Sequence, residues 1–254
     1  MNFALFAADS VGNEIAHYFG ENNERLSCLV VDSEDKKGIN KEIIARGKKI
    51  NCTNIFSHQT LYDSETIAKL KKLNLDLIIL AWWPYIIKKE LIRIPKIGCL
   101  NFHPSFLPYN RGKHYNFWAI VEDVPFGVTI HWVTEEIDAG DIAFQKGIRT
   151  SWEDTGETLY YKAQKEIVNL FKDNFFKIKK GDIPRIPQNL HEGSFHLSTE
   201  IDRASRIELD KKYKARELLN IIRARSFAPH PAAWFIEGGK KYEVRVNIKE
   251  KKEI

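Results

Sequence analysis

A chain of 254 residues with 43% hydrophobic and 12% aromatic residues can form one large core and a smaller appended unit. The net charge of +5 suits an anionic small substrate and would also suit RNA, so charge alone excludes neither. Three scattered cysteines exclude a disulfide framework and lack metal-ligand spacing. The N-terminus lacks signal-peptide features and no apolar run reaches membrane-spanning length, which predicts a soluble cytoplasmic protein.

The first part of the chain alternates short apolar runs with helical patterns, as parallel strands joined by helices do. The predicted strands are Phe3–Ala8, Leu26–Asp32, Ile55 with Phe56, Leu75–Ala81 and Gly98–His103, and the predicted helices are Val11–Phe19, Asn40–Gly47 and Asp63–Leu73. Leu75–Ala81 is apolar apart from Asp76, which is typical of a strand covered on both faces. We therefore expect an α/β fold with a Rossmann-like, mostly parallel sheet.

The pattern then changes to two alternating runs, Gly127–Thr134 and Ile142–Arg149, which predict an antiparallel extension of this sheet. A long helical pattern follows over Thr155–Lys180, and Asp154 with Glu157 has the spacing of a capping box. The turn-rich segment after this helix marks a boundary between a catalytic domain, residues 1–182, and a small C-terminal domain, residues 183–254.

The C-terminal domain is predicted to be a small helix and β-hairpin unit. Lys214–Arg223 has an amphipathic helical pattern. Ala233–Ile236 and Tyr242–Ile248 flank Glu237-Gly238-Gly239-Lys240, which is a hairpin signal.

Polar side chains cluster in Asn101–Gly112, at the carboxyl end of a predicted buried strand, where ligands of open α/β sheets bind. On a strand, Asn101 and His103 project to the same face. An amide can hold a developing oxyanion and an imidazole can exchange protons near neutral pH, so the pair suits an acyl-type transfer. A hydrogen-bonded turn at a strand end is the alternative, and these two residues alone leave both interpretations open.

The loop Thr134–Asp141 holds four carboxylates between two predicted strands. One carboxylate turned toward His103 would fix the tautomer of the imidazole and stabilise its charged form. The sequence leaves open whether Asp138 or Asp141 does this, and a solvated acidic loop is the alternative interpretation.

Other candidate sites have weaker support. Ser10 and Gly12 follow the first strand, where a helix N-terminus can hold a phosphate, but the segment lacks the glycine-rich dinucleotide and Walker patterns. Plain turn chemistry explains these residues equally well. The adjacent indoles Trp82 and Trp83 either pack in the core or form the wall of a site for a flat ring system. None of the eight histidines has metal-ligand spacing, so we expect no metal.

Asn101-Phe102-His103-Pro104-Ser105-Phe106-Leu107-Pro108, followed by Ile137-Asp138-Ala139-Gly140-Asp141, resembles the folate-dependent formyltransferases, and the likeness extends from about Leu75 to Leu170. The resemblance implies a catalytic trio of Asn101, His103 and Asp138, and it is the resemblance that selects Asp138 over Asp141. It also implies N10-formyltetrahydrofolate as co-substrate. The residues it implies for the folate pocket are Trp83, Pro84, Tyr85 and Ile86, with Thr134 and Ile137 on another wall.

Two further segments, Asn110–Trp118 and Ile222–Phe235, resemble the branch that formylates nucleotide-linked amino sugars. The tRNA enzymes of the family continue into a full basic OB-type domain, whereas only about one hairpin follows here. Ala232-Ala233 departs from the usual pair of a small residue and glycine, and Phe106 stands where Leu is commoner. Neither departure touches the trio.

The resemblance implies a nucleotide-linked amino-dideoxyhexose as acceptor, with dTDP preferred over UDP or GDP as the nucleotide and 4-amino-4,6-dideoxyglucose as the leading sugar. Ser10, Gly12, Arg111 and Lys113 are the candidates for binding its diphosphate, and Arg111 offers the planar recognition that suits phosphate. We expect a homodimer that binds no nucleic acid or membrane and that acts in lipopolysaccharide O-antigen biosynthesis. The alternatives are a compact methionyl-tRNA formyltransferase and a catalytically silent folate- or nucleotide-binding module.

Overall fold

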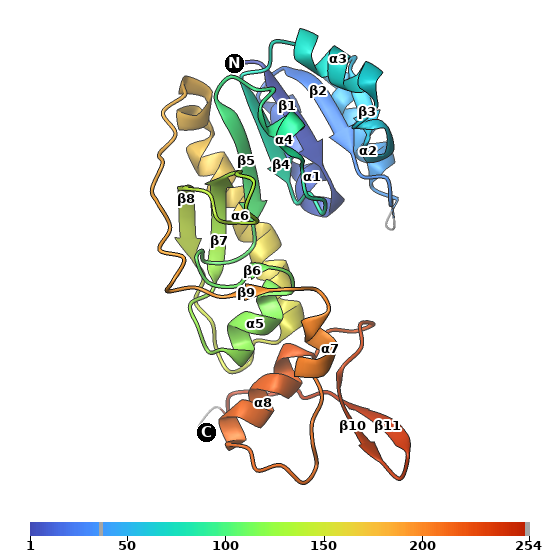
Figure 1. Cartoon of the computed structure of the whole chain (residues 1–254), viewed down its shortest axis with the longest axis vertical. Helices are drawn as coiled ribbons and strands as arrows, with labels where there is room; N and C mark the ends of the chain where they lie inside the picture. The colour runs from blue at the N-terminus through green and yellow to red at the C-terminus, as the bar shows by residue number, and fades with distance from the viewer. Residues whose placement is uncertain (36–37, 252–254) are drawn as a thin grey trace. The chain divides into compact units, whose positions relative to one another are not determined.

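The computed structural model describes residues 1–35 and 38–251, and within these ranges the strands form one seven-stranded sheet and two small two-stranded sheets (Figure 1). The large sheet has the order β3-β2-β1-β4-β5-β7-β8. Its strands are β1 (Phe3–Ala7), β2 (Leu26–Val31), β3 (Ile55–Ser57), β4 (Leu77–Ala81), β5 (Gly98–His103), β7 (Gly127–Trp132) and β8 (Ile142–Gly147). Strands β1 to β5 pair in parallel, and β7 runs antiparallel to β5. The predicted α/β class with an antiparallel extension is confirmed.

The chain forms two compact units, each assembled from segments that are distant in sequence. The first comprises residues 1–103, 129–145 and 164–188, and the second comprises residues 104–128, 146–163 and 189–254. The functional boundary after residue 182 stays a prediction.

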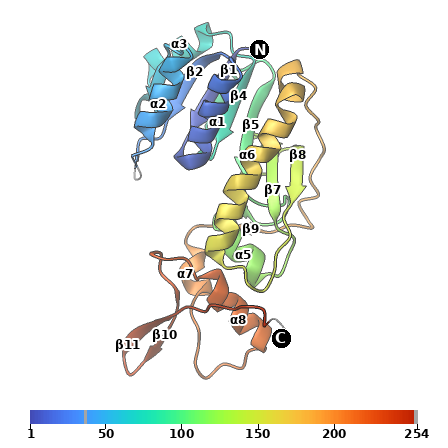
Figure 2. The ribbon, with the colours of Figure 1, turned by 180° about the vertical axis from the view of Figure 1, so that it is seen from behind.

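In the first unit, helices cover both faces of the parallel strands, as the mostly apolar character of these strands requires. The helices are α1 (Asp9–Glu21), α2 (Asn40–Lys49), α3 (Ser64–Lys72) and α4 (Lys89–Ile92), with a 3-10 turn at His58–Thr60. An aromatic cluster of Phe3, Phe19, Phe171 and Phe175 joins β1, α1 and the long helix α6 (Gly156–Lys180) on the face seen in Figure 2. Residues of α3 and α4 pack with apolar side chains of β1, β2, β4 and β5 in a second cluster.

The cysteines lie in this core rather than at a reactive surface. Cys28, Cys52 and Cys99 are all free and buried. Burial raises the pKa of the Cys99 thiol to about 12. Such a thiol stays protonated at neutral pH and acts as a small apolar side chain.

The second unit contains α5 (Tyr115–Val121), α7 (Glu200–Ala204), α8 (Ala215–Ala224) and two small sheets. Strand β6 (Arg111–Gly112) pairs in parallel with β9 (Phe195–His196). The predicted hairpin is present as β10 (Ala233–Glu237) and β11 (Lys240–Val244), although its second strand begins and ends earlier than predicted. Gly238 and Gly239 both have positive φ, which a two-residue turn of this kind requires. No helix among the described residues is long and apolar enough to cross a membrane.

The start of α6 is fixed by side-chain hydrogen bonds, one residue later than predicted. Thr155 and Thr158 exchange bonds between hydroxyl and backbone N–H, in place of the predicted Asp154–Glu157 pair. Asp154 is 4% exposed, and its carboxylate accepts bonds from the Ser151 N–H and the Thr158 hydroxyl and pairs with Lys162 at 2.7 Å. Burial opposes its ionisation, but these partners outweigh burial and hold the pKa of Asp154 below its usual range.

Replacing Asp154 with Asn is expected to lower the free energy of unfolding by about 2–3 kcal/mol near pH 7, because buried donors lose a charged acceptor. A depressed folded-state pKa stabilises the protein above the unfolded pKa, and this stabilisation is lost as the pH falls through the folded value. The difference between Asp154→Asn and wild type should therefore shrink in acid. Urea unfolding at neutral and acid pH measures it, with Asp173→Asn, exposed on the same helix, as control. Equal stability of wild type and Asp154→Asn at neutral pH would contradict the expectation.

Candidate active site

The structure brings the side chains of Asn101, His103 and Asp138 together at the carboxyl end of β5. His103 is 4% exposed, and its Nδ1 lies 3.4 Å from Asp138 Oδ2. The other carboxylate oxygen, Asp138 Oδ1, accepts a long bond of 3.4 Å from Asn101 Nδ2. One carboxylate therefore contacts both the amide and the imidazole. Of the two carboxylates that the sequence left open, Asp138 is the one placed against His103.

The loop after β7 presents the Asp138 carboxylate in a constrained conformation. Asp138 has a φ of +51°, which is uncommon for a residue with a side chain. Gln188 Nε2 donates to the carbonyl oxygens of Asp138 at 3.0 Å and Gly140 at 2.6 Å. A Cβ at Gly140 would lie 1.9 Å from the Trp132 carbonyl oxygen, so only glycine permits this close approach. The Ile137–Asp141 motif thus has a steric basis as well as a chemical one.

His131 is a fourth polar residue of this cluster, and the sequence analysis missed it. It lies on β7 directly opposite Asn101 and is 2% exposed. Its Nδ1 lies 2.9 Å from the Trp132 carbonyl oxygen, which assigns a proton to Nδ1. Its Nε2 lies 3.1 Å from Asn101 Nδ2 and 3.4 Å from Asp138 Oδ1. Alternation along β7 predicts which of its residues share a face, but His131 can be placed beside Asn101 only once the register of β7 against β5 is known.

The segment after β4, which the resemblance implies for the folate pocket, divides into anchors and an exposed tip. Trp83 is 8% exposed and packs edge-on against Phe6. The Tyr85 ring stacks on His58 at 3.5 Å, and its hydroxyl donates to Asp32 Oδ1 at 2.5 Å. Pro84 and Ile86 are exposed. The packing interpretation therefore holds for the Trp83 side chain, and Ile86 is the apolar side chain that this segment displays to solvent.

The other predicted folate wall lies beside this segment. Lys89, at the start of α4, forms an ion pair of 2.5 Å with Glu135 of the acidic loop. Ile86, which precedes Lys89, and Ile137, which follows Glu135, are both exposed apolar side chains. Thr134 is exposed, and its hydroxyl donates to the Glu136 carbonyl. The two loops can thus present apolar groups to a flat ring system.

The four residues predicted to bind the diphosphate fall into two sets. Ser10 and Gly12 lie in the first turn of α1, where a Cβ at Gly12 would meet the backbone of Ala7 at 2.8 Å, so Gly12 is needed for helix–strand packing. Arg111 and Lys113 belong to the second unit, on and directly after β6. Among the described residues, no group of three or more His, Cys, Asp or Glu side chains is arranged to hold a metal ion.

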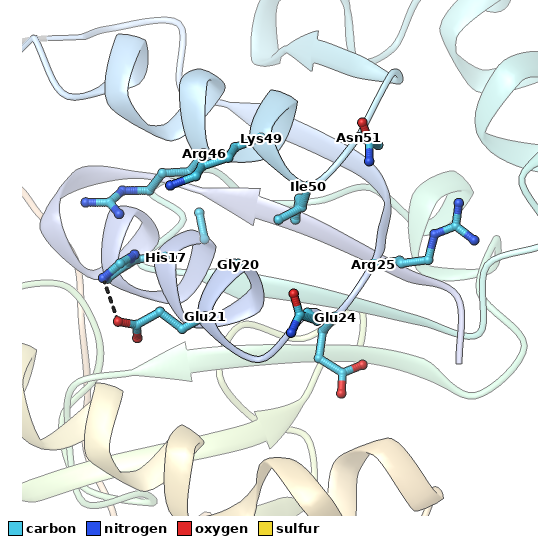
Figure 3. A pocket seen from close by; sticks show the side chains of 11 residues that line it. His17, Gly20, Glu21, Glu24, Arg25, Arg46, Lys49, Ile50 and Asn51 are labelled. Carbon is cyan, nitrogen blue, oxygen red and sulfur yellow. Dashed lines mark ion pairs between the residues drawn. The ribbon is translucent and has the colours of Figure 1, made fainter.

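A surface hollow of about 420 Å³ lies elsewhere, between the C-terminal ends of α1 and α2 (Figure 3). Its lining includes His17, Glu21, Arg25, Arg46 and Lys49. Figure 3 shows the Arg25 and Arg46 side chains pointing in opposite directions, so these cations do not converge on one ligand. The hollow lies at the amino ends of the parallel strands, at the opposite edge from Asn101 and His103, and it is not the candidate active site.

Residues 1–173 match the formyl transferase family, and residues 200–250 match the N-formyltransferase dimerization C-terminal domain. The chain is 31% identical over 220 residues to methionyl-tRNA formyltransferase of Fusobacterium nucleatum subsp. nucleatum, covering 81% of this chain and 69% of that one. A sugar N-formyltransferase structure from a Shewanella species aligns with a TM-score of 0.83 at 22% identity, covering 99% of this chain and 100% of that one.

The formyltransferase PseJ from Anoxybacillus kamchatkensis, solved with UDP-4,6-dideoxy-4-formamido-L-AltNAc and tetrahydrofolate, aligns with a TM-score of 0.60 at 25% identity, covering 80% of this chain and 89% of that one.

A buried cluster of amide, imidazole and carboxylate at the carboxyl edge of an α/β sheet suits a group-transfer enzyme. The family match covers more than half of the chain. The protein belongs to the formyl transferase family.

Proposed function

We propose that this protein transfers the formyl group of N10-formyltetrahydrofolate to the amine of a nucleotide-linked amino-dideoxy sugar, with dTDP-4-amino-4,6-dideoxyglucose as the leading acceptor. The observation that carries the reaction is the joint contact of Asp138 with Asn101 and His103. The sugar acceptor is supported by the alignment with a sugar N-formyltransferase over nearly the full length of both chains.

In the proposed mechanism the neutral amine attacks the formyl carbon and a new C–N bond forms. Asn101 donates a hydrogen bond to the oxyanion of the tetrahedral intermediate. His103, held by Asp138, takes the proton that the attacking nitrogen loses and delivers it to N10 of the folate. The C–N10 bond then breaks and tetrahydrofolate leaves. The Ile86 and Ile137 side chains give the folate ring an apolar contact on two sides.

The test is a screen of nucleotide-linked amino sugars with N10-formyltetrahydrofolate, with products identified by mass. We expect a formylated sugar with a mass increase equal to one CO group. Turnover of any such amine also excludes the catalytically silent binding module. A screen in which dTDP-, UDP- and GDP-linked amino sugars all remain unmodified would contradict the proposal.

Methionyl-tRNA formyltransferase is the second candidate, and the 31% identity to the Fusobacterium enzyme favours it. Charging tRNA with methionine and adding it to the same assay separates the two candidates. A tRNA acceptor predicts an affinity that falls steeply with salt, because Lys and Arg side chains would neutralise phosphates and release counterions. The sugar acceptor predicts no formyl-methionyl-tRNA and no tRNA binding.

We also propose that the protein is a homodimer formed through its C-terminal hairpin. The match to a dimerization domain over residues 200–250 supports this. In the hairpin Ile236 and Tyr242 are both nearly half exposed, and Tyr242 stacks on Phe235 at 5.4 Å. Sedimentation is expected to give a dimer, and a monomer at working concentration would contradict it.

A further inference from the structure

The short segment Asn110–Lys113 carries two of the proposed phosphate-binding side chains, Arg111 and Lys113, and a distant part of the chain holds its backbone in place. The Asn110 N–H donates to Ser194 Oγ at 3.1 Å. The Arg111 N–H donates to the Ser194 carbonyl, and the Lys113 N–H donates to the His196 carbonyl, both at 3.0 Å. These bonds join β6 to β9 (Figure 1). All of these residues lie in the second unit.

Two residues of the segment have positive φ values and lie in close contact with their surroundings. Asn110 is 1% exposed and has a φ of +54°. Gly112 has a φ of +88°, and a Cβ there would lie 2.3 Å from the His196 carbonyl oxygen. Asn and Gly tolerate positive φ better than other residues do, and at Gly112 the close approach of the His196 carbonyl leaves no room for a side chain. Arg111 and Lys113 therefore depend on these contacts for their placement.

Glu122, at the C-terminal end of α5, is the residue in which these contacts converge. Its Oε2 accepts from Asn110 Nδ2 at 2.9 Å and from Ser194 Oγ at 2.8 Å. Its Oε1 lies 2.7 Å from His196 Nε2, as an ion-pair contact rather than an aligned hydrogen bond. The His196 ring in turn stacks on Trp118 at 3.7 Å with an interplanar angle of 7°. One carboxylate thus links both ends of the β6–β9 pair.

We propose that Glu122 is a positioning residue that holds the Asn110–Lys113 segment so that Arg111 and Lys113 bind the diphosphate of the acceptor. This inference rests on the proposed function. A carboxylate repels a diphosphate, so removing Glu122 would tighten binding if its charge acted only through space. If positioning is its role, removal weakens binding. The sign of the change therefore separates the two effects.

The experiment compares Glu122→Ala and Glu122→Gln with Asp123→Ala, an exposed carboxylate on the next residue that lies 3.9 Å from Arg216. Losing hydrogen bonds to a charged acceptor is expected to raise the KM for the nucleotide sugar about tenfold in Glu122→Ala. The kcat and the KM for N10-formyltetrahydrofolate should stay near wild type. Glu122→Gln should recover most of the loss, because its amide oxygen can still accept from Asn110 and Ser194. A purely structural role would instead lower kcat through loss of folded enzyme and leave KM unchanged.

Calorimetric titration with dTDP and UDP gives a second measurement that needs no amine. We expect Glu122→Ala to bind about tenfold more weakly than wild type and Asp123→Ala to bind equally. If Glu122→Ala does not fold, Ser194→Ala carries the test, because it removes the hydroxyl that joins Asn110 to Glu122. Equal or tighter binding by a wild type-like folded variant overturns the inference alone. A wild type that binds neither nucleotide and formylates no nucleotide sugar overturns the proposed function as well.

Discussion

Replacing His103 with Asn is expected to lower kcat for formyl transfer by roughly 10²–10⁴, the range that a positioned acid–base group contributes. In the proposed mechanism His103 Nδ1, which lies 3.4 Å from Asp138 Oδ2, holds a proton, and Nε2 exchanges protons with the substrates. Asn is smaller than His, but its amide nitrogen can take the place of Nδ1 and donate to Asp138, and it cannot carry a proton between two nitrogens. The KM for N10-formyltetrahydrofolate should therefore change little.

Single-turnover kinetics with saturating co-substrate measures the chemical step directly. His17→Asn is the matched control, because His17 is partly exposed on α1, away from the candidate site, and pairs only with Glu21 among the contacts that the described residues make. Asp138→Asn should also lower kcat, and the double variant should be no slower than the slower single variant, since groups that act as a unit are not additive. Near wild-type turnover in both single variants would refute the assignment of the site.

The parallel sheet could be predicted because each of its strands carries a local signal. The apolar runs of β1 and β4 are continuous and that of β2 is interrupted only by Ser27. Helical segments with polar faces separate these runs, so periodicity and length identify the strands without knowledge of their partners. Strands β6 and β9 have only two residues each and pair across more than eighty positions. Neither a period nor a turn signal exists over two residues, so this pairing could not be found in the sequence.

The candidate site was predictable to the extent that it depends on one strand. Asn101 and His103 share a face of β5 by simple alternation. His131 enters through the register of β7 against β5, which depends on the pairing of two strands rather than on either strand alone. The sequence also could not show that the Trp83 side chain is buried while Ile86 is exposed. Adjacent indoles such as Trp82 and Trp83 occur both in packed cores and in the walls of ligand sites, so their residue type alone does not decide between the two.

Asn101→Ala is expected to lower kcat by roughly 10²–10³, the usual cost of losing one oxyanion donor. His131 Nε2 holds one N–H of the Asn101 amide at 3.1 Å. Asn101 Nδ2 also makes a long contact of 3.4 Å to Asp138 Oδ1, which itself lies 3.4 Å from His131 Nε2. Both acceptors therefore lie on one side of the amide nitrogen, and a substrate oxyanion can compete for an N–H of this amide. A rate loss with an unchanged KM for both substrates is the signature of a contact that forms in the transition state. A raised KM with normal kcat would instead assign Asn101 to substrate binding.

Asn101→Asp sharpens this test, because it keeps the shape of the side chain and removes the donor. The new carboxyl group would stand about 3.4 Å from Asp138 Oδ1, and two carboxylates this close cannot both ionise freely, so one pKa of the pair rises. In its protonated form the new group can again donate to the oxyanion. The ratio of kcat in Asn101→Asp to kcat in wild type should therefore increase as the pH falls through the raised pKa, while the ratio for Asn101→Ala stays flat. Taking ratios at each pH cancels the titration of the substrate amine, which is common to all three proteins. Parallel profiles for Asn101→Asp and Asn101→Ala would show that hydrogen-bond donation at this position does not stabilise the transition state.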